Sequence, residues 1–269
     1  MSANYSSPVS ELLTLGDCRD FREWPNYLDL GLRSEHVPEL IEMATDNELN
    51  WADSESLEVW APVHAWRALG QLRAVSAVEP LLHLFHKLED SDWASDELPQ
   101  VYGMIGREAI PALARYLDDA SHGLWPHVTA AFSLERIAAG DPSARSECVT
   151  ILSRQLERFT ENDPTLNGFL INYLVNLRAV EAAPLVERAF AADRVDLSIL
   201  GDWEDAQVEL GLKATRETPR PYRPLFPMFD APARDEPHRG ENTEKAAAKQ
   251  KKAKRKQARA SRKKHRKRR

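Results

Sequence analysis

The chain has 269 residues, of which 42% are hydrophobic and 29% are charged, so it can form one sizeable folded region with polar tails. It has no apolar run of roughly eighteen residues and no secretory leader pattern, which predicts a cytoplasmic protein without membrane insertion. Its two cysteines, Cys18 and Cys148, are isolated. They exclude a disulfide framework and a Cys-based zinc site, and indicate two small buried side chains.

The formal net charge of −6 conceals two oppositely charged parts. Residues 245–269 hold fifteen of the 36 Lys and Arg residues and no Asp or Glu. Residues 1–244 therefore carry 21 basic and all 42 acidic residues, which gives a body near −21 and a tail near +15. Each part is expected to attract partners of the opposite charge.

In chain order, residues 1–33 are polar and are predicted to form an N-terminal cap segment. A helix is predicted from Ser34, a candidate N-cap, because apolar residues then recur at helical spacing on one face at Val37, Leu40, Ile41 and Ala44. Residues 46–55 are acidic and polar, and we expect them to connect this helix to the next unit.

The central unit runs from Trp60 to Leu82 and is predicted to be two short helices joined by a tight turn. Small apolar residues line one face of the first helix at spacings of three and four: Ala61, Ala65, Ala68, Leu69 and Leu72. The second helix begins near Val75, with Pro80 in its first turns. Such a helical hairpin cannot bury both faces alone, so it requires similar neighbours.

Similar units follow over residues 93–117, 127–156 and 169–185. The pattern of Ala77-Val78 with Leu81 recurs 32 residues later, and Gly70 is expected to recur in the turn as Gly106. The stretches RAVSAVEP and RAVEAAPL begin 105 residues apart, at Arg73 and Arg178, which fits three units of about 35 residues. About four to five hairpins are therefore expected over residues 34–212.

The folded body is expected to close with a short helix near 201–212, whose acids Asp202, Glu204 and Asp205 would form a solvated outer face. Six prolines over residues 213–244 predict an irregular linker. Its apolar part, residues 221–229, could either dock a partner or cover the chain's own repeat surface.

The repeated unit resembles a known family. The residues that carry the resemblance are Ala68-Leu69-Gly70, Ala77-Val78-Glu79-Pro80-Leu81 and Ala109-Ile110-Pro111-Ala112-Leu113. They are similar to HEAT-like repeats, most closely the short bacterial type first associated with phycobilisome lyases. The resemblance implies an all-α fold, a right-handed α-solenoid that binds proteins or nucleic acids on a concave surface. It also leaves open a lyase or DNA-repair enzyme, and it transfers no site residue because the motif consists of packing residues.

The candidate protein-binding groove lies on the first helix of the central unit. With the alanines turned into the core, Trp60, His64 and Arg67 share another stripe, and Trp66 lies elsewhere on the same helix. Trp and Arg are common in binding hot spots, so these four residues could form a recognition patch. Alternatively, Trp60 and Trp66 fill space against the N-terminal cap and His64 makes an ordinary hydrogen bond.

Catalytic and metal sites are weakly indicated. His83 and His86 are three residues apart, and His122 and His127 flank a Trp-Pro turn. Neither pair has a Cys or acidic partner at a recognised spacing, so we predict no metal, no cofactor and no catalytic residue. The body's charge also argues against a nucleic-acid groove of the glycosylase type.

The tail, residues 245–269, is predicted to be disordered and to bind RNA or DNA non-specifically, because it is dense in cations and lacks aromatic residues. An alternative is that it folds back on the acidic body or only affects solubility. The candidate nucleic-acid-binding residues are Lys251, Lys252, Lys254, Arg255, Lys256, Arg262, Lys263, Lys264, Arg266, Lys267, Arg268 and Arg269. The sequence thus favours a non-enzymatic scaffold with an unidentified protein partner.

Overall fold

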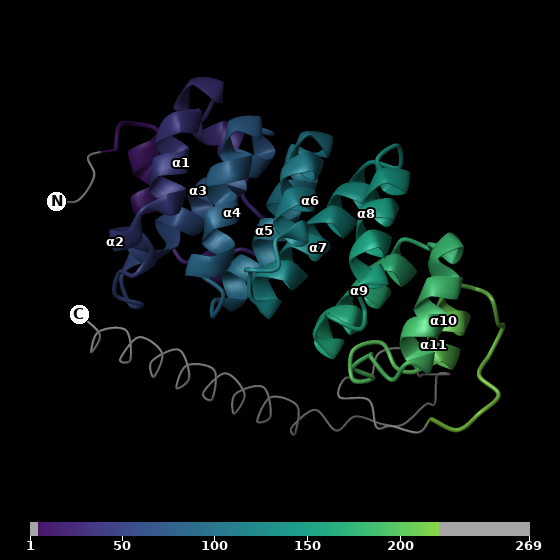
Figure 1. Ribbon diagram of the computed structural model, residues 1–269. Helices are drawn as coiled ribbons and strands as arrows, with labels where there is room; N and C mark the ends of the chain where they lie inside the picture. The colour runs from purple at the N-terminus through teal and green to yellow at the C-terminus, as the bar shows by residue number, and fades with distance from the viewer. Residues whose placement is uncertain (1–4, 221–269) are drawn as a thin grey trace, which may run out of the picture. The chain divides into compact units, whose positions relative to one another are not determined.

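A computed structural model describes residues 5–220, which lie within one compact unit, Met1–Phe226. The second unit, Pro227–Arg269, lies outside the described residues. The described part is entirely helical, as predicted, with eleven α-helices and several short 3-10 helices (Figure 1). None of the helices in residues 5–220 is long and apolar enough to cross a membrane.

The N-terminal part folds as 3-10 turns, at Val9–Leu13, Cys18–Asp20 and Tyr27–Leu30, before the first α-helices. The helix predicted from Ser34 consists of a 3-10 turn, Ser34–His36, followed by α1, Val37–Thr45. Ser34 therefore does not cap the α-helix, because the chain enters it through this extra turn. The expected connector contains a one-turn helix, α2 (Asn47–Asn50), whose N-terminal amides are capped by the side chain of Asp46.

The remaining α-helices follow one another along the chain in the predicted order of first and second helices. They are α3 (Ala61–Gln71) with α4 (Val78–Lys87), α5 (Asp92–Ile105) with α6 (Ile110–Asp118), α7 (Leu124–Gly140) with α8 (Arg145–Glu157), and α9 (Pro164–Asn176) with α10 (Ala183–Ala191), followed by α11 (Trp203–Glu209). This confirms the predicted helices of each unit.

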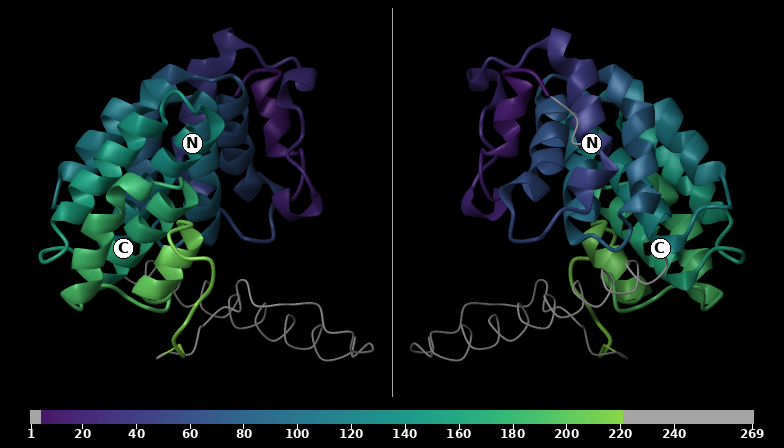
Figure 2. Two further views of the ribbon diagram at one scale, coloured as in Figure 1. Left: turned by 90° about the vertical axis from the view of Figure 1, so that its right-hand side faces the viewer. Right: turned by 90° about the vertical axis from the view of Figure 1, so that its left-hand side faces the viewer.

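The pairs are arranged in two rows. In the first row, α3, α5, α7 and α9 lie side by side, and in the second row α4, α6, α8 and α10 do the same (Figures 1 and 2). Helices α4, α6 and α8 each pack against the first-row helix of the next pair, so one continuous hydrophobic core runs along the rows. Each of these second-row helices thus buries apolar side chains against the unit that follows it.

The two similar sequence stretches 105 residues apart form the same turn. Arg73 and Arg178 both have positive φ, 51° and 52°, and each lies two residues after the last residue of its helix, α3 or α9. In both turns the next amide reaches back into the helix: Ala74 N–H donates to the Leu69 carbonyl, and Ala179 N–H to the Leu174 carbonyl. This hydrogen bond closes a Schellman-type helix end. The similar stretches RAVSAVEP and RAVEAAPL therefore form the same type of helix C-terminus.

Gly70 and Gly106 are not equivalent, which corrects the prediction that both occupy the turn. Gly106 does lie at the end of α5, with φ 95°. Gly70 lies inside α3, where an added Cβ would come within 3.3 Å of the Val101 Cα. The turn after α3 instead uses Arg73, so Gly70 allows close approach of α5 and has no role in the turn.

Candidate functional site

His64 lies in the interior, where the N-terminal segment crosses α3. Its Nε2 is 3.0 Å from the Gly16 carbonyl oxygen, and because a carbonyl only accepts, Nε2 carries the proton. Nδ1 therefore accepts a hydrogen bond from the Tyr27 hydroxyl, with 2.7 Å between the nitrogen and the hydroxyl oxygen. The Cys18 sulfur lies 3.5 Å from Nε2. One imidazole thus contacts three parts of the N-terminal segment and holds them on α3.

Arg67 makes a buried ion pair with Glu97 of α5. Its Nε donates to Oε2 of Glu97 at 2.7 Å, and its Nη2 donates to Oε1. Trp66 Nε1 donates to the same Oε2 at 3.3 Å, and the guanidinium carbon lies 5.0 Å from the ring centre of Trp24 and 5.9 Å from that of Trp93. Burial is the largest single effect and lowers the pKa of Arg67, but the hydrogen bonds and charges around the guanidinium, with Glu97 the main partner, together raise the pKa above its usual value. The charged guanidinium therefore joins α3 to α5.

The expected exposure of the four groove candidates is wrong. Between 0 and 8% of the surface of each is accessible: Trp60, His64, Trp66 and Arg67. The 3-10 turns of residues 5–33 pack against α3 and cover the face that was expected to be exposed. The guanidinium carbon of Arg19, for example, lies 5.0 Å from the ring centre of Trp60. The alternative, in which Trp60 packs against the N-terminal cap and His64 makes a hydrogen bond, describes these two positions, whereas Trp66 donates to Glu97 of α5.

Cys18 and His64 are the one Cys–His contact in residues 5–220, so their protonation decides whether they resemble a nucleophile and its base. Burial raises the pKa of the Cys18 thiol to about 12. Burial also lowers the pKa of His64 to about 4. Both groups are therefore neutral near pH 7, and a nucleophilic cysteine needs its thiolate form. Cys148 is likewise buried and free.

The acidic residues of α11 are paired, which corrects the predicted solvated face. Glu204 accepts hydrogen bonds from the amides of Glu217 and Thr218, at 2.9 and 3.1 Å, and from Lys213 Nζ at 3.1 Å. The Thr218 and Glu217 hydrogen bonds hold the pKa of Glu204 down, to about 2. Arg216 also donates to Asp202, at 2.8 Å. Residues 213–220 are thus fastened to α11 and belong to the folded body, whereas the predicted linker began at 213.

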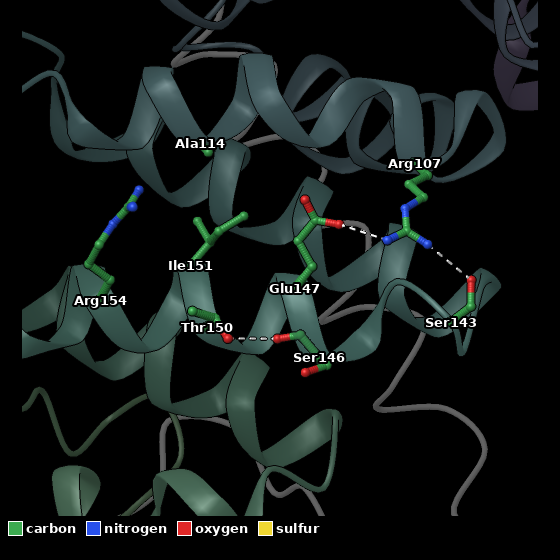
Figure 3. Close-up of a pocket in the computed structure, with 8 residues that line it drawn as sticks. All are labelled: Arg107, Ala114, Ser143, Ser146, Glu147, Thr150, Ile151 and Arg154. Carbon is green, nitrogen blue, oxygen red and sulfur yellow. Dashed lines mark hydrogen bonds and ion pairs between the residues drawn. The ribbon is translucent and has the colours of Figure 1, made fainter.

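A groove of about 590 Å³ lies between α6 and α8 and is lined by the residues drawn in Figure 3. Its charged groups already have protein partners. Arg107 bridges to Glu147 at 3.2 Å and to the Ser143 hydroxyl at 3.4 Å, while Arg154 pairs with Asp118 at 2.8 Å. The groove is therefore a shallow gap between neighbouring helices. The charged side chains that line it form ion pairs with each other or with Asp118.

The ring centres of the sequence pair His122 and His127 lie 5.9 Å apart, and His122 also contacts a histidine of another helix. His86 of α4 contacts His122, which precedes α7, with 2.6 Å between Nε2 and Nδ1. His83 takes no part in this contact, and the Nδ1 of His127 lies 2.9 Å from the Gly123 carbonyl. Within the described chain no three His, Cys, Asp or Glu residues are grouped so as to hold a metal ion.

Aromatic side chains form a partly exposed row across α7 and α9 that the sequence analysis missed. Trp125 is 51% exposed and its ring centre lies 6.1 Å from that of Phe169. Phe169 stacks with Tyr173 at 6.1 Å, and Tyr173 stacks on Phe132 at 5.3 Å. These four residues are called the aromatic row below. The spacing of seven between Trp125 and Phe132, which places both on one helical face, was the available signal.

The twelve basic candidates between Lys251 and Arg269 lie outside the described residues, as does the apolar segment 221–229. Comparison of the chain with protein-family models, with curated proteins and with solved structures gives no match.

Proposed function

We propose that the chain is a non-enzymatic scaffold built as a right-handed α-solenoid of HEAT-like hairpins. It binds a protein partner on its repeat surface and binds RNA or DNA non-specifically through its polybasic tail. The observation that carries the proposal is the division of charge between the body, near −21, and residues 245–269, near +15. The neutral Cys18–His64 contact supports the non-enzymatic part, because it holds neither a thiolate nor a basic imidazole poised for proton transfer.

Regular bridges between second-row helices support the repeat architecture. Arg115 of α6 pairs with Glu79 of α4, Arg154 of α8 pairs with Asp118 of α6, and Arg145 of α8 pairs with Glu181, just before α10. Each pair joins residues 36 positions apart. A constant offset in the bridges is what similar units stacked in one register produce.

The aromatic row supports a binding surface for a protein. An exposed aromatic side chain such as that of Trp125 is costly to leave in water, and Trp supplies much of the binding energy at protein interfaces. Trp125 and Phe169 lie on successive first-row helices, so a partner crossing both would contact neighbouring units. The row replaces the four buried candidates on α3 as the proposed contact surface.

The tail supports nucleic-acid binding by its charge density. Phosphate contacts by Lys and Arg release counterions, so affinity falls steeply as salt rises. The experiment is a salt series on duplex DNA and structured RNA with the full chain and with a tail variant carrying K251Q, K252Q, K254Q, R255Q and K256Q. We expect binding at 50 mM salt to weaken by about tenfold or more, and the salt slope to fall by up to about four.

A matched control keeps the same change in net charge on the body. Five exposed basic residues of the body are changed instead: R22Q, K87Q, R115Q, R154Q and R188Q. This variant should keep the binding and salt slope of the full chain. Equal losses in both variants, or no binding of the full chain at low salt, would show that the tail is not the nucleic-acid element.

A further inference from the structure

An exposed histidine and a half-buried one, from different helical units, meet at the surface of the body. His86 lies near the end of α4, and His122 lies in the turn between α6 and α7. Their facing nitrogens, Nε2 and Nδ1, are 2.6 Å apart and their ring centres are 4.4 Å apart. His86 is exposed and the His122 side chain keeps 17% of its surface accessible, so solvent ions reach the pair.

The surroundings of His122 fix the orientation of its ring. Tyr116 stacks on it with 3.8 Å between ring centres and 14° between ring planes. The other ring nitrogen, Nε2, faces the Asp119 carboxylate at 3.7 Å. A carboxylate on that side favours the tautomer with the proton on Nε2, which leaves the lone pair of Nδ1 directed at His86.

The 2.6 Å contact is a hydrogen bond, in which Nε2 of His86 donates to Nδ1 of His122. When the His86 proton moves to its other ring nitrogen, two imidazole lone pairs, one from α4 and one from the turn before α7, become ligands for a divalent transition metal. Metal–nitrogen bonds of about 2.0–2.1 Å put two ligating nitrogens roughly 3 Å apart. A small rotation of the exposed His86 ring would supply that separation. His86 would then carry its proton on Nδ1, so binding to the neutral pair releases no proton.

Two carboxylates add favourable charge around the pair. Asp119 lies on one side, and an added Cβ on Gly123 would lie 3.6 Å from Oε2 of Glu89, so Glu89 also borders the turn. No third side chain in residues 5–220 completes a cluster, so water would fill the remaining positions. We propose that His86 and His122 form a two-histidine site for a divalent transition metal ion, with Cu²⁺ bound more tightly than Zn²⁺.

The site would connect different units of the stack, since its ligands come from α4 and from the turn before α7. This inference is independent of the proposed partner and nucleic-acid binding. An ion there would bind the folded chain more tightly than the unfolded one and would therefore raise its melting temperature.

The test titrates the full chain with Cu²⁺ and with Zn²⁺ by calorimetry and compares it with H86A, H122A and H83A. His83 is exposed on α4, one turn before His86, and is the matched control. We expect about tenfold weaker binding, or more, in H86A and H122A and no change in H83A. Asp119→Asn should weaken binding by about tenfold, as loss of an orienting partner does.

Electron paramagnetic resonance of the Cu²⁺-loaded chain gives a second readout. Nitrogen hyperfine coupling from two imidazoles is expected in the full chain and in H83A, and coupling from fewer imidazoles in H86A and H122A. Circular dichroism checks that the variants remain helical. Equal affinity and equal spectra in all variants would overturn the site, as would binding that H83A weakens as much as H86A.

Discussion

The Arg67–Glu97 pair is the most buried ion pair that joins two first-row helices in residues 5–220, with 3% and 8% of the two side chains exposed. Removing one partner from a buried pair leaves the other charge without compensation, which costs about 3–5 kcal/mol. We therefore expect Arg67→Met to lower the free energy of unfolding by about that amount, measured by urea denaturation at neutral pH. The double variant R67M/E97L should recover most of the loss, because a well-packed apolar pair can replace a buried ion pair.

An exposed pair provides the control for this prediction. Arg115 and Glu79 also form an ion pair between neighbouring units, but 66% and 63% of their side chains are exposed. Arg115→Met should cost less than about 1 kcal/mol, because solvent screens such pairs. Similar losses for Arg67→Met and Arg115→Met would contradict a structural role for the buried charge.

Residue roles could be predicted only where they depend on local sequence. The pattern on α3 did single out Trp60, His64 and Arg67, but it could not show that residues 5–33 return across the same helix. Covering by a distant segment depends on tertiary packing, and helical periodicity carries no information about it. The same limit hid the contact between His86 and His122, because each histidine had a nearer His in the chain.

At the scale of elements, Gly103 controls how closely α5 and α7 approach. An added Cβ there would lie 3.1 Å from the Cβ of Arg136 and 3.3 Å from its backbone carbonyl. Overpacking costs about 1–3 kcal/mol, against a helix-propensity gain of at most about 1 kcal/mol for Ala over Gly. Because backbone atoms of α7 cannot yield as a side chain end would, we expect Gly103→Ala to lower the urea midpoint at an unchanged m-value.

Gly140 is the control, since it lies on the partner helix and faces the same contact. Its added Cβ would be 3.8 Å from the Gly103 carbonyl oxygen, an ordinary contact distance. Gly140→Ala should be neutral or gain up to about 1 kcal/mol. A stabilised Gly103→Ala variant would mean that the two helices separate easily.

The elements themselves were largely predictable from the sequence. Apolar spacing of three and four located α3 to α10 because each helix buries one stripe against its neighbours. Their ends were less predictable: a positive φ at Arg73 is unexpected for a residue with a side chain, so Gly70 was placed in the turn instead. The one-turn helix α2 was missed since four residues give no periodicity.

At the scale of the whole molecule, the two proposed binding functions use separate parts of the chain. The aromatic row lies on α7 and α9, whereas the cationic residues begin at Lys245. The sequence revealed the charge division directly, because net charge needs no fold. It did not reveal the row, whose members come together only when α7 packs beside α9. Two separate surfaces should be separable by substitution.

The last prediction tests that separation in the full chain. Trp125→Ser should weaken binding of a protein partner by about thirtyfold, which corresponds to roughly 2 kcal/mol for a hot-spot Trp, and should leave nucleic-acid binding and its salt slope unchanged. Trp51→Ser is the matched control, since Trp51 is 48% exposed but lies outside the aromatic row. The measurement is recovery of proteins bound to immobilised full chain, followed by affinity titration of the recovered protein.

The tail variant should show the opposite pattern: it should keep its binding of the protein partner and lose its binding of nucleic acid. Loss of both activities in either variant would mean that the surfaces act together, because a scaffold with independent surfaces loses one at a time.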